Sequence, residues 1–394
     1  MDIFAKTEKQ QVYDLLKQND CYPYFHSLNS RQDTVVDMEG ERTLMIGSNN
    51  YLGLTSHPDV VSAGVKALKE YGSGCSGSRF LNGTLKLHLQ LEQDLADFLG
   101  KQAAMTFSTG FQSNLGIISA LVGRNDYVLC DKENHASIYD ACRLSFGKML
   151  RYNHGDMEHL ENLLKTVPDT CGCLIVTDGV FSMSGEICKL PQIVDLAKKY
   201  GARVMVDDAH GLGVLGERGK GTAEYFGLTE EVDVIMGTFS KSLASLGGYM
   251  ASTSRAVEYV KHNSRPYIFS ASMTPASAAC ALKALEILKN EPQRVKNLFD
   301  VANYMRNALK KRGIAIIDSA TPIIPIYVYD DLKAFEACKL LLQKGVYVNP
   351  VVSPATPPNM ALLRTSYTAT HTFEQMDDAA EKINDVLSVL GVKK

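Results

Sequence analysis

Three short segments of this sequence place acidic, basic and hydroxyl side chains directly after runs of apolar, β-branched residues. The runs are CLIVT, ARVMV and VDVIM, and the segments that follow them are Asp178–Ser182 (DGVFS), Asp207–Gly211 (DDAHG) and Gly237–Ser242 (GTFSKS). In an open parallel sheet, ligands bind beyond the carboxyl ends of the strands. If the three runs are strands of one sheet, they deliver carboxylates, a histidine, hydroxyls and a lysine to one edge. The sequence therefore predicts a ligand site at this edge.

Lys241 is the most informative of these residues. It stands among small residues over positions 240–248. A lysine in a surface salt bridge needs no small neighbours, whereas a lysine bonded to a bulky cofactor does. Taken alone, a lysine after a strand is usually a surface residue. The Asp207 and His210 pair on a nearby strand end favours the functional interpretation.

The residue types in these segments match what pyridoxal phosphate (PLP) requires of a protein. The cofactor needs a lysine for an imine, a carboxylate beside its ring nitrogen, donors for its phosphate and a flat partner for its ring. Asp207 can supply the carboxylate, His210 can reach the ring oxygen, and Thr238 has a hydroxyl placed for the phosphate. The structural alternatives are that Asp207 caps a helix and that His210 is a buried core histidine with its hydrogen bonds made inside the protein.

A second phosphate-binding element is predicted upstream. The segment STGFQSN (Ser108–Asn114) precedes the apolar run LGIISALV. A glycine-containing turn that opens a helix binds anions through its free N–H groups and the helix dipole. We expect the phosphate here, with a plain helix cap as the alternative. His135, after the strand-like run YVLCD, is a candidate partner for the ring, although a lone histidine after a strand is usually structural.

The segment GSGCSG at residues 72–77 matches the dinucleotide fingerprint G-x-G-x-x-G. That fingerprint must follow a strand and open a helix, with an acidic residue at the end of the next strand. Here it follows a helical pattern formed by Val61, Val65 and Leu68, and only the helical run LEQDLADFLG comes next. We therefore expect a compact loop with Arg79 near its end.

Hydrophobic periodicity predicts the elements that hold these residues. Apolar residues at helical spacing predict one helix that begins at Asp156. A second helix is predicted over Leu190–Tyr200, and Gly201 ends it. Continuous apolar strands that alternate with helices indicate a parallel sheet covered on both faces, and so an α/β protein. Strands of a smaller sheet are expected at Ile323–Tyr329, Gly345–Pro350 and Leu362–Tyr367, before a last helix with the apolar stripe Phe373, Met376, Ala380, Ile383, Leu387 and Leu390.

These patterns divide the chain into three parts. We expect an N-terminal segment (residues 1–60), a large ligand-binding domain (61–284) and a small C-terminal domain (285–394). The second boundary is placed in the helical run that begins at Thr274.

Composition excludes several kinds of partner. The net charge is −3 and no charged tail is present, so nucleic acid and anionic lipid are not supported. Charged residues interrupt every apolar stretch before it reaches transmembrane length, and residues 1–11 lack a secretory pattern, so we expect a cytoplasmic protein. The nine cysteines are odd in number and form no C-x-x-C pair. Reduced thiols are therefore expected, and no metal site.

The ordered motifs resemble the α-oxoamine synthases, PLP enzymes of the aspartate-aminotransferase fold type. The similarity extends over almost the whole chain, in SNNYLGL, GSGCSGSRFLNGT, STGFQSN, NHAS, DGVFSMSGE, VDDAHGLGVLG, TFSKS, RPYIFSASMTP and LLRTSYTATHT. It implies a fold type I enzyme with a large, mostly parallel sheet domain and a smaller C-terminal α+β domain.

The resemblance also implies the cofactor site. Lys241 is expected to bind PLP as a Schiff base, and His135, Asp207 and His210 are the other expected catalytic residues. The expected cofactor-binding residues are Gly110, Phe111, His135, Ser182, Asp207, His210, Thr238, Lys241, Ser270 and Ser272. Ser270 and Ser272 would come from the partner subunit of a homodimer, since family sites lie across a subunit interface.

For the substrates, the resemblance implies an amino acid and an acyl-CoA. Asn50 and Arg364 would bind the amino-acid carboxylate, Arg364 by a bidentate pair, and Ala355 and Thr356 belong to the substrate-binding segment. Lys241, freed by the incoming amino acid, would remove the α-proton, and the resulting carbanion would attack the thioester. CoA and carbon dioxide would then leave.

The segment Ser353–Pro357 (SPATP) resembles the P-P-A-T-P element of serine palmitoyltransferases, although Ser353 replaces the first proline. TFSKSLAS also favours that branch, which condenses L-serine with palmitoyl-CoA. The other branches are 2-amino-3-ketobutyrate CoA ligase (glycine and acetyl-CoA), 8-amino-7-oxononanoate synthase and 5-aminolevulinate synthase. Two further alternatives are an aminotransferase or lyase on the same fold and a catalytically silent subunit, and Lys241 argues against the last.

Overall fold

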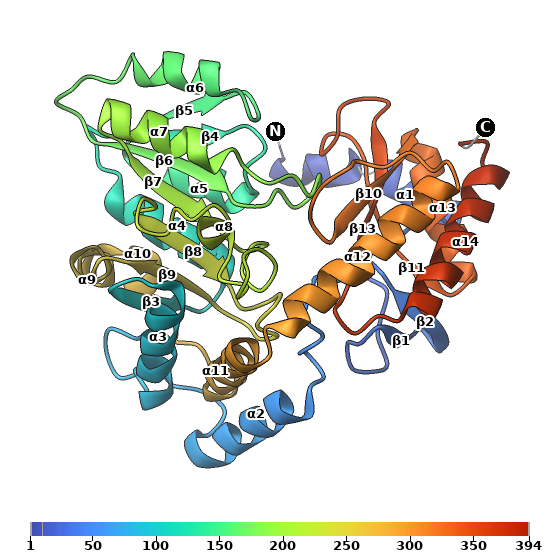
Figure 1. The fold of residues 1–394 in the computed structure, drawn as a ribbon, viewed down its shortest axis with the longest axis horizontal. Helices are drawn as coiled ribbons and strands as arrows, with labels where there is room; N and C mark the ends of the chain where they lie inside the picture. Colours follow the sequence, from blue (N-terminus) through green and yellow to red (C-terminus); the bar gives the residue numbers. More distant parts are fainter. Residues whose placement is uncertain (1, 10, 393–394) are drawn as a thin grey trace. The chain divides into compact units, whose positions relative to one another are not determined.

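The computed structural model describes residues 2–9 and 11–392, and these form two compact units (Figure 1). The larger unit is Asn49–Leu298, and the smaller unit combines the residues up to Ser48 with those from Phe299 on. These boundaries differ from the expected ones. The first part of the chain packs with the last part instead of standing alone, and the second boundary lies inside the helix α12 (Gln293–Lys311). A continuous helix gives no local sign that its two ends belong to different units.

The larger unit is built on a seven-stranded sheet in the order β3-β9-β8-β7-β6-β4-β5. Only β9 is antiparallel to its neighbours, so the sheet is mostly parallel, as expected. The central strands are buried along their length, which agrees with a sheet covered on both faces. The strands are β3 (Ala103–Phe107), β4 (Tyr127–Asp131), β5 (Lys148–Tyr152), β6 (Cys173–Asp178), β7 (Arg203–Asp207), β8 (Val234–Thr238) and β9 (Gly248–Ser252).

Helices pack on this sheet in two groups. The helices α4 (Gly110–Leu121) and α5 (Ala136–Leu144) contact each other, and so do α6 (Met157–Leu164) and α7 (Leu190–Tyr200). Crossovers between parallel strands are right-handed, and the chain moves along the sheet in opposite directions before and after β5, so the two groups cover opposite faces. The remaining helices of the unit are α2 (Pro58–Tyr71), α3 (Lys86–Leu99), α8 (Thr222–Tyr225), α9 (Ser254–Asn263), α10 (Arg265–Ile268) and α11 (Pro275–Asn290).

Local signals account for the helix ends in this unit. Asp156 caps α6 by accepting a hydrogen bond from the backbone N–H of His159 at 2.9 Å. Gly201 ends α7 with φ of 67°, a left-handed conformation that glycine adopts without strain. Both predicted helices are confirmed.

The glycine-rich segment at residues 72–77 is a loop between α2 and α3. The element directly before it is the helix α2 and not a strand, so it is no dinucleotide fingerprint. The helical pattern in front of it is confirmed as α2, but Val61, Val65 and Leu68 are 45–48% exposed. The apolar stripe that indicated the helix thus faces away from the core of the unit.

The smaller unit contains two three-stranded sheets. One has the order β1 (Val35–Met38), β2 (Glu41–Met45), β11 (Val346–Tyr347), and the other β10 (Ile323–Tyr329), β13 (Ala361–Ser366), β12 (Asn349–Val351). The single strand expected at Gly345–Pro350 is therefore two, because the chain leaves one sheet after Tyr347 and joins the other at Asn349.

Helices complete the α+β arrangement of the smaller unit. They are η1 (Ile3–Lys9), α1 (Gln11–Gln18), α13 (Asp331–Gln343) and α14 (Phe373–Val389), together with the second part of α12. The expected stripe of α14 lies in the core except at its ends, where Phe373 is half exposed and stacks on Tyr304 at 4.5 Å. Among the residues described, no helix of either unit is long and apolar enough to cross a membrane.

Candidate active site

A cavity of about 260 Å³ lies at the carboxyl ends of the central strands of the larger unit. The ends of β6, β7 and β8 and the first turns of α4 and α5 contribute to its walls. The structure thus brings together residues that are far apart in the sequence. Eight residues singled out from the sequence line it: Gly110, Phe111, His135, Ser182, Asp207, His210, Thr238 and Lys241.

Asp207 ends β7 and presents a buried carboxylate to the cavity. Its side chain is 4% exposed. One oxygen accepts a hydrogen bond from Asn114 Nδ2 at 2.7 Å, and the other accepts one from the backbone N–H of Ala209 at 3.0 Å. This fixes the carboxylate on β7, with lone pairs left for a protonated ring nitrogen. Asp207 does not cap a helix among the described residues, so its alternative role has no support.

Asn114, on α4, is the residue that orients Asp207. It is fully buried and donates a second hydrogen bond to Ser137 Oγ at 2.8 Å, while its own Oδ1 has no hydrogen-bond partner among the described residues. Sequence reasoning assigned it no role of its own. The only signal was an amide just before an apolar helical run.

A second carboxylate, Asp178, lies directly opposite Asp207 in the register of β6 and β7. Burial raises the pKa of Asp178 well above its usual range, and the charge of Asp207 raises it further, while Lys241 opposes both. Asp178 Oδ2 accepts the backbone N–H of His135 at 3.0 Å. Asp178 thereby positions the start of α5, a function the sequence did not reveal.

His135 is the N-cap of α5 and lines the cavity from that helix. Its Nδ1 accepts the backbone N–H of Ser137 at 3.3 Å, and its ring stands edge to face with Phe111 at 6.3 Å between centroids. Burial lowers the pKa of His135, and Lys241 lowers it further against the opposing effect of Asp207. A neutral ring suits an apolar stacking surface for an aromatic cofactor.

Thr238 and Gly110 form one wall of the cavity together. A Cβ atom on Gly110 would lie 2.8 Å from Thr238 Oγ1, so only glycine fits here. The close approach places the first turn of α4 beside the Thr238 hydroxyl, which is 3.0 Å from Ser240 Oγ. Thr109 caps the helix by accepting the Gln112 N–H at 3.1 Å. A helix start next to two hydroxyls is a site for an anion such as a phosphate.

His210 lies three residues after the end of β7 and lines the same cavity. Its Nδ1 is 2.7 Å from the hydroxyl of Tyr51, and both residues are buried. Tyr51 belongs to the motif SNNYLGL but had been given no role, and nothing in its local sequence marks it as a partner of a residue 159 positions away.

Three of the remaining predicted residues of the larger unit, Asn50, Ser270 and Ser272, are not among the cavity-lining residues. The backbone N–H and the hydroxyl of Ser272 both bind the carbonyl of Gly77, at 3.0 and 3.2 Å. The segment with Ser270 and Ser272 is thus tied to the glycine-rich loop of its own chain.

The predicted substrate residues Arg364, Ala355 and Thr356 belong to the smaller unit. Arg364 is buried on β13, with Nη1 at 3.4 Å from Ser366 Oγ. Ala355 is exposed, and Thr356 is buried with no hydrogen-bond partner for its hydroxyl among the described residues.

The residues of the cavity fit PLP. Lys241 lines it, the Asp207 carboxylate is held in place, and the turn at Gly110 leaves no room for a side chain, as a phosphate cradle requires. Neutral His135 offers a flat face. These are the groups that the cofactor demands.

Comparisons with known proteins place the chain in a family. The family model for aminotransferase class I and II matches residues 42–383, so the chain belongs to that family. It is 53% identical to serine palmitoyltransferase from Sphingobacterium spiritivorum over 94% of this chain and 93% of that protein. It is 41% identical to 8-amino-7-oxononanoate synthase 1 from Bacillus velezensis over 96% of each chain.

A solved structure has the same fold. A variant of serine palmitoyltransferase from S. paucimobilis, with a bound PLP–myriocin aldimine, superposes with a TM-score of 0.96 at 36% identity over 100% of both chains. The resemblance to the α-oxoamine synthases and the predicted fold type are thus confirmed, and PLP is the cofactor.

Proposed function

We propose that this protein is a serine palmitoyltransferase. It condenses L-serine with palmitoyl-CoA and releases carbon dioxide and CoA, which gives 3-ketodihydrosphingosine, the first intermediate of sphingolipid synthesis. The observation that carries the proposal is the cavity in which Lys241 is joined by Asp207, His135 and His210, in a chain 53% identical to a serine palmitoyltransferase.

When bound, PLP supplies a cationic ring that accepts the electron pair left at the serine α-carbon. Asp207, held by Asn114, keeps a proton on the ring nitrogen. Lys241 holds the cofactor and then moves the α-proton as a free amine. Gly110, Phe111 and Thr238 would hold the phosphate, and His135 would cover the ring.

Further residues serve the ring oxygen and the substrate. His210, anchored by Tyr51, and Ser182 lie near the ring oxygen in this proposal. Asn50 and Arg364 bind the serine carboxylate, and a guanidinium suits that group because it donates two parallel hydrogen bonds. Ala355 and Thr356 belong to the segment that distinguishes the substrates.

The proposal includes a homodimer in which Ser270 and Ser272 complete the partner's site. Two features support it. Neither serine lines the cavity of its own chain. Phe269 beside them is 74% exposed and Leu81 in the adjoining loop is 77% exposed, so a partner subunit over this segment would cover both side chains. We also place the enzyme in the cytoplasm, as expected from the sequence.

A product assay tests the substrates. Serine, glycine and alanine are each combined with palmitoyl-CoA, acetyl-CoA and pimeloyl-CoA, and the products are read by mass. We expect the serine and palmitoyl-CoA pair to dominate. Each buried methylene contributes ~0.8 kcal/mol, so a channel for the acyl chain favours palmitoyl-CoA over acetyl-CoA by orders of magnitude.

The same assay separates the alternatives. A dominant glycine and acetyl-CoA product would identify a 2-amino-3-ketobutyrate CoA ligase, and alanine with pimeloyl-CoA an 8-amino-7-oxononanoate synthase. Turnover of amino acids without any thioester would indicate an aminotransferase or lyase. Each of these results would overturn the proposed substrates.

A further inference from the structure

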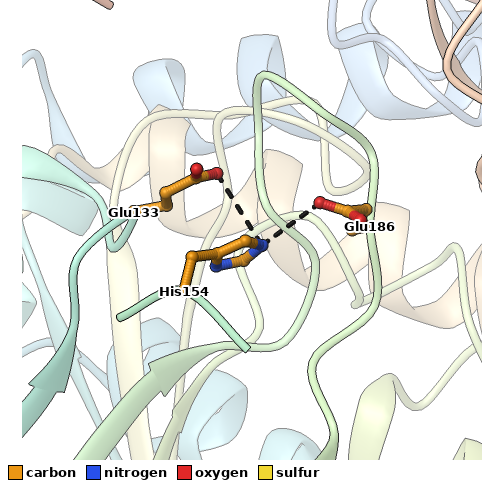
Figure 2. Close-up of side chains that lie close together, drawn as sticks. All are labelled: Glu133, His154 and Glu186. Carbon is orange, nitrogen blue, oxygen red and sulfur yellow. Dashed lines mark hydrogen bonds and ion pairs between the residues drawn. The ribbon is translucent and has the colours of Figure 1, made fainter. Parts of the chain in front are cut away.

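Outside the cavity, a histidine is surrounded by carboxylates. His154 follows β5, and Figure 2 shows its ring between Glu133 and Glu186. Its Nδ1 is 2.9 Å from Asp131 Oδ1, and its Nε2 is 3.1 Å from Glu186 Oε2 and 3.7 Å from Glu133 Oε2. We call these four residues the His154 cluster.

The geometry identifies His154 as a cation. An ionised carboxylate only accepts hydrogen bonds, and a neutral imidazole has one donor nitrogen. Because both ring nitrogens face carboxylate oxygens, both must carry hydrogen. Burial alone would lower the pKa of His154, but the hydrogen bonds with Asp131 and Glu186 outweigh it and raise the pKa to about 10.

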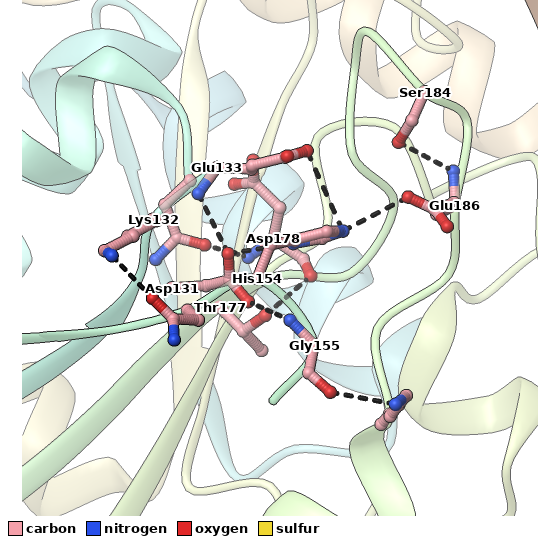
Figure 3. A network of polar contacts seen from close by, with 12 residues as sticks. Asp131, Lys132, Glu133, His154, Gly155, Thr177, Asp178, Ser184 and Glu186 are labelled. Carbon is pink, nitrogen blue, oxygen red and sulfur yellow. Dashed lines mark hydrogen bonds and ion pairs between the residues drawn. The ribbon is translucent and has the colours of Figure 1, made fainter. Parts of the chain in front are cut away.

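The His154 cluster joins three loops (Figure 3). Asp131, at the end of β4, also accepts the backbone N–H of Glu133 at 2.8 Å and that of Gly155 at 3.0 Å. It therefore fixes both the loop that follows β4 and the loop that carries His154. Glu186 belongs to the third loop, which is closed on itself by the Phe181–Glu186 backbone hydrogen bond at 2.9 Å.

Two of these loops carry residues of the cofactor cavity. The loop after β4 continues through Asn134, whose side chain binds the backbone at Val176 and Asp178, to His135. The loop with Glu186 carries Ser182, and the ring of Phe181 packs edge to face on His154 with centroids 4.4 Å apart. One cation thus lies between the loop of His135 and the loop of Ser182.

We propose that His154 is a positioning residue for cofactor binding: its imidazolium holds the His135 loop and the Ser182 loop at their separation across the cavity. This rests on the proposed function only in that the cavity binds PLP. The other charged side chains nearby do not replace it. Lys132 binds Asn153 Oδ1 at 2.5 Å, and Lys189 binds the carbonyl of Gly155 at 2.8 Å.

The same ligand atoms raise the rival possibility of a metal ion. The nitrogen of His154 and oxygens of Glu133 and Glu186 lie within 4.8 Å of one another. A histidine coordinates a metal through an unprotonated ring nitrogen, whereas the His154 nitrogen carries hydrogen in the ion pair. Zinc and a positioning cation therefore predict different results in one experiment.

The test measures PLP affinity by fluorescence titration of the protein freed of PLP, and thermal unfolding with and without PLP. His154→Gln keeps one donor but loses the charge, and Glu186→Gln loses one carboxylate. Both glutamates are half exposed, so the effect is moderate: we expect PLP to bind ~3- to 10-fold more weakly in each variant. The rise in melting temperature on adding PLP should shrink accordingly.

His262→Gln is the matched control, because His262 forms an exposed ion pair with Glu258 on α9, at 3.4 Å and outside the cavity. It should bind PLP as the wild type does. Wild-type PLP affinity in both His154→Gln and Glu186→Gln would overturn the inference, as would an equal loss of melting temperature with and without PLP. Loss of wild-type affinity on chelation, restored by Zn²⁺, would also overturn it.

These outcomes are separate from those of the product assay. A wild type that does not bind PLP would contradict the proposed function itself. If the wild type binds PLP and the variants bind it equally well, that result would contradict only the role of His154.

Discussion

The functional side chains are held in place by partners that are distant in the sequence. Asn114 on α4 orients Asp207 on β7, and Tyr51 anchors His210. The types Lys, Asp and His at strand ends could be recognised from the sequence because the chemistry demands them. Their supports could not, because an asparagine or a tyrosine in an ordinary helix or loop has no local signature of such a role.

The first prediction concerns Lys241. Borohydride reduction of the PLP-loaded protein should attach the pyridoxyl group to this lysine, which peptide mapping would show. Lys241→Ala should still bind PLP, because Asp207 and the wall formed by Gly110 and Thr238 remain, but its turnover should be abolished. Label on any other lysine would refute the assignment.

Asn114 offers a sharper test of the electrostatics. Asn114→Ala removes a hydrogen bond to a buried carboxylate, which is worth ~1.5–3 kcal/mol. We expect kcat to fall by roughly ten- to a hundredfold, with the fold retained and Asp207 less well placed beside the ring nitrogen. Ser137→Ala removes the other partner of Asn114 and a contact of the Ser137 hydroxyl with His135 Nδ1 at 2.7 Å, but it keeps the hydrogen bond to Asp207, so its effect on kcat should be smaller. Equal kcat in Asn114→Ala and the wild type would show that Asp207 needs no orienting partner.

At the scale of elements, the accuracy of prediction followed the strength of the local signals. The helix α7 has the predicted bounds, because Gly201 stops it. β6, β7 and β8 were found to within two residues, since buried parallel strands are continuous apolar runs. The strand expected at Gly345–Pro350 is two strands, and the unit boundary lies in α12. Both depend on which distant strand or helix the segment packs against, and the segment's own residues do not encode that.

Helix α3 and the segment before α11 are joined by His88, and this contact depends on pH. His88 Nδ1 accepts the Leu85 N–H at 3.1 Å, and its Nε2–H donates to the Met273 carbonyl at 3.1 Å. Burial, together with Arg79, lowers the pKa of His88 to about 4. The folded pKa is below the unfolded value, so the stabilisation is present above pH ~6.5 and is lost as the pH falls toward 4.

We therefore expect His88 to contribute up to about 3 kcal/mol to the acid destabilisation between pH 6.5 and 4. His88→Gln does not titrate, so it should flatten this part of the curve of melting temperature against pH while lowering stability at pH 7. Parallel curves for variant and wild type would show that His88 does not titrate in this range.

At the scale of the whole molecule, the question is what covers the exposed apolar residues of the larger unit. Phe269, Leu81 and the α2 stripe of Val61, Val65 and Leu68 are all 45% or more exposed. Ser270 follows Phe269 directly, and Ser272 lies two residues further on. An isologous interface over the segment of Phe269 and the adjoining loop of Leu81 would bury these two side chains and deliver each chain's serines to its partner.

Hybrid dimers test this arrangement. Chains with Lys241→Ala are co-expressed under a different tag with chains in which both Ser270 and Ser272 are replaced by alanine. If the serines act in the partner's site, a hybrid contains one site with Lys241 and both serines intact. A random mixture should then recover about a quarter of wild-type activity, although each variant alone is inactive or strongly impaired. If the serines serve their own chain, no hybrid site is intact, and the mixture should show only the average of the two homodimers.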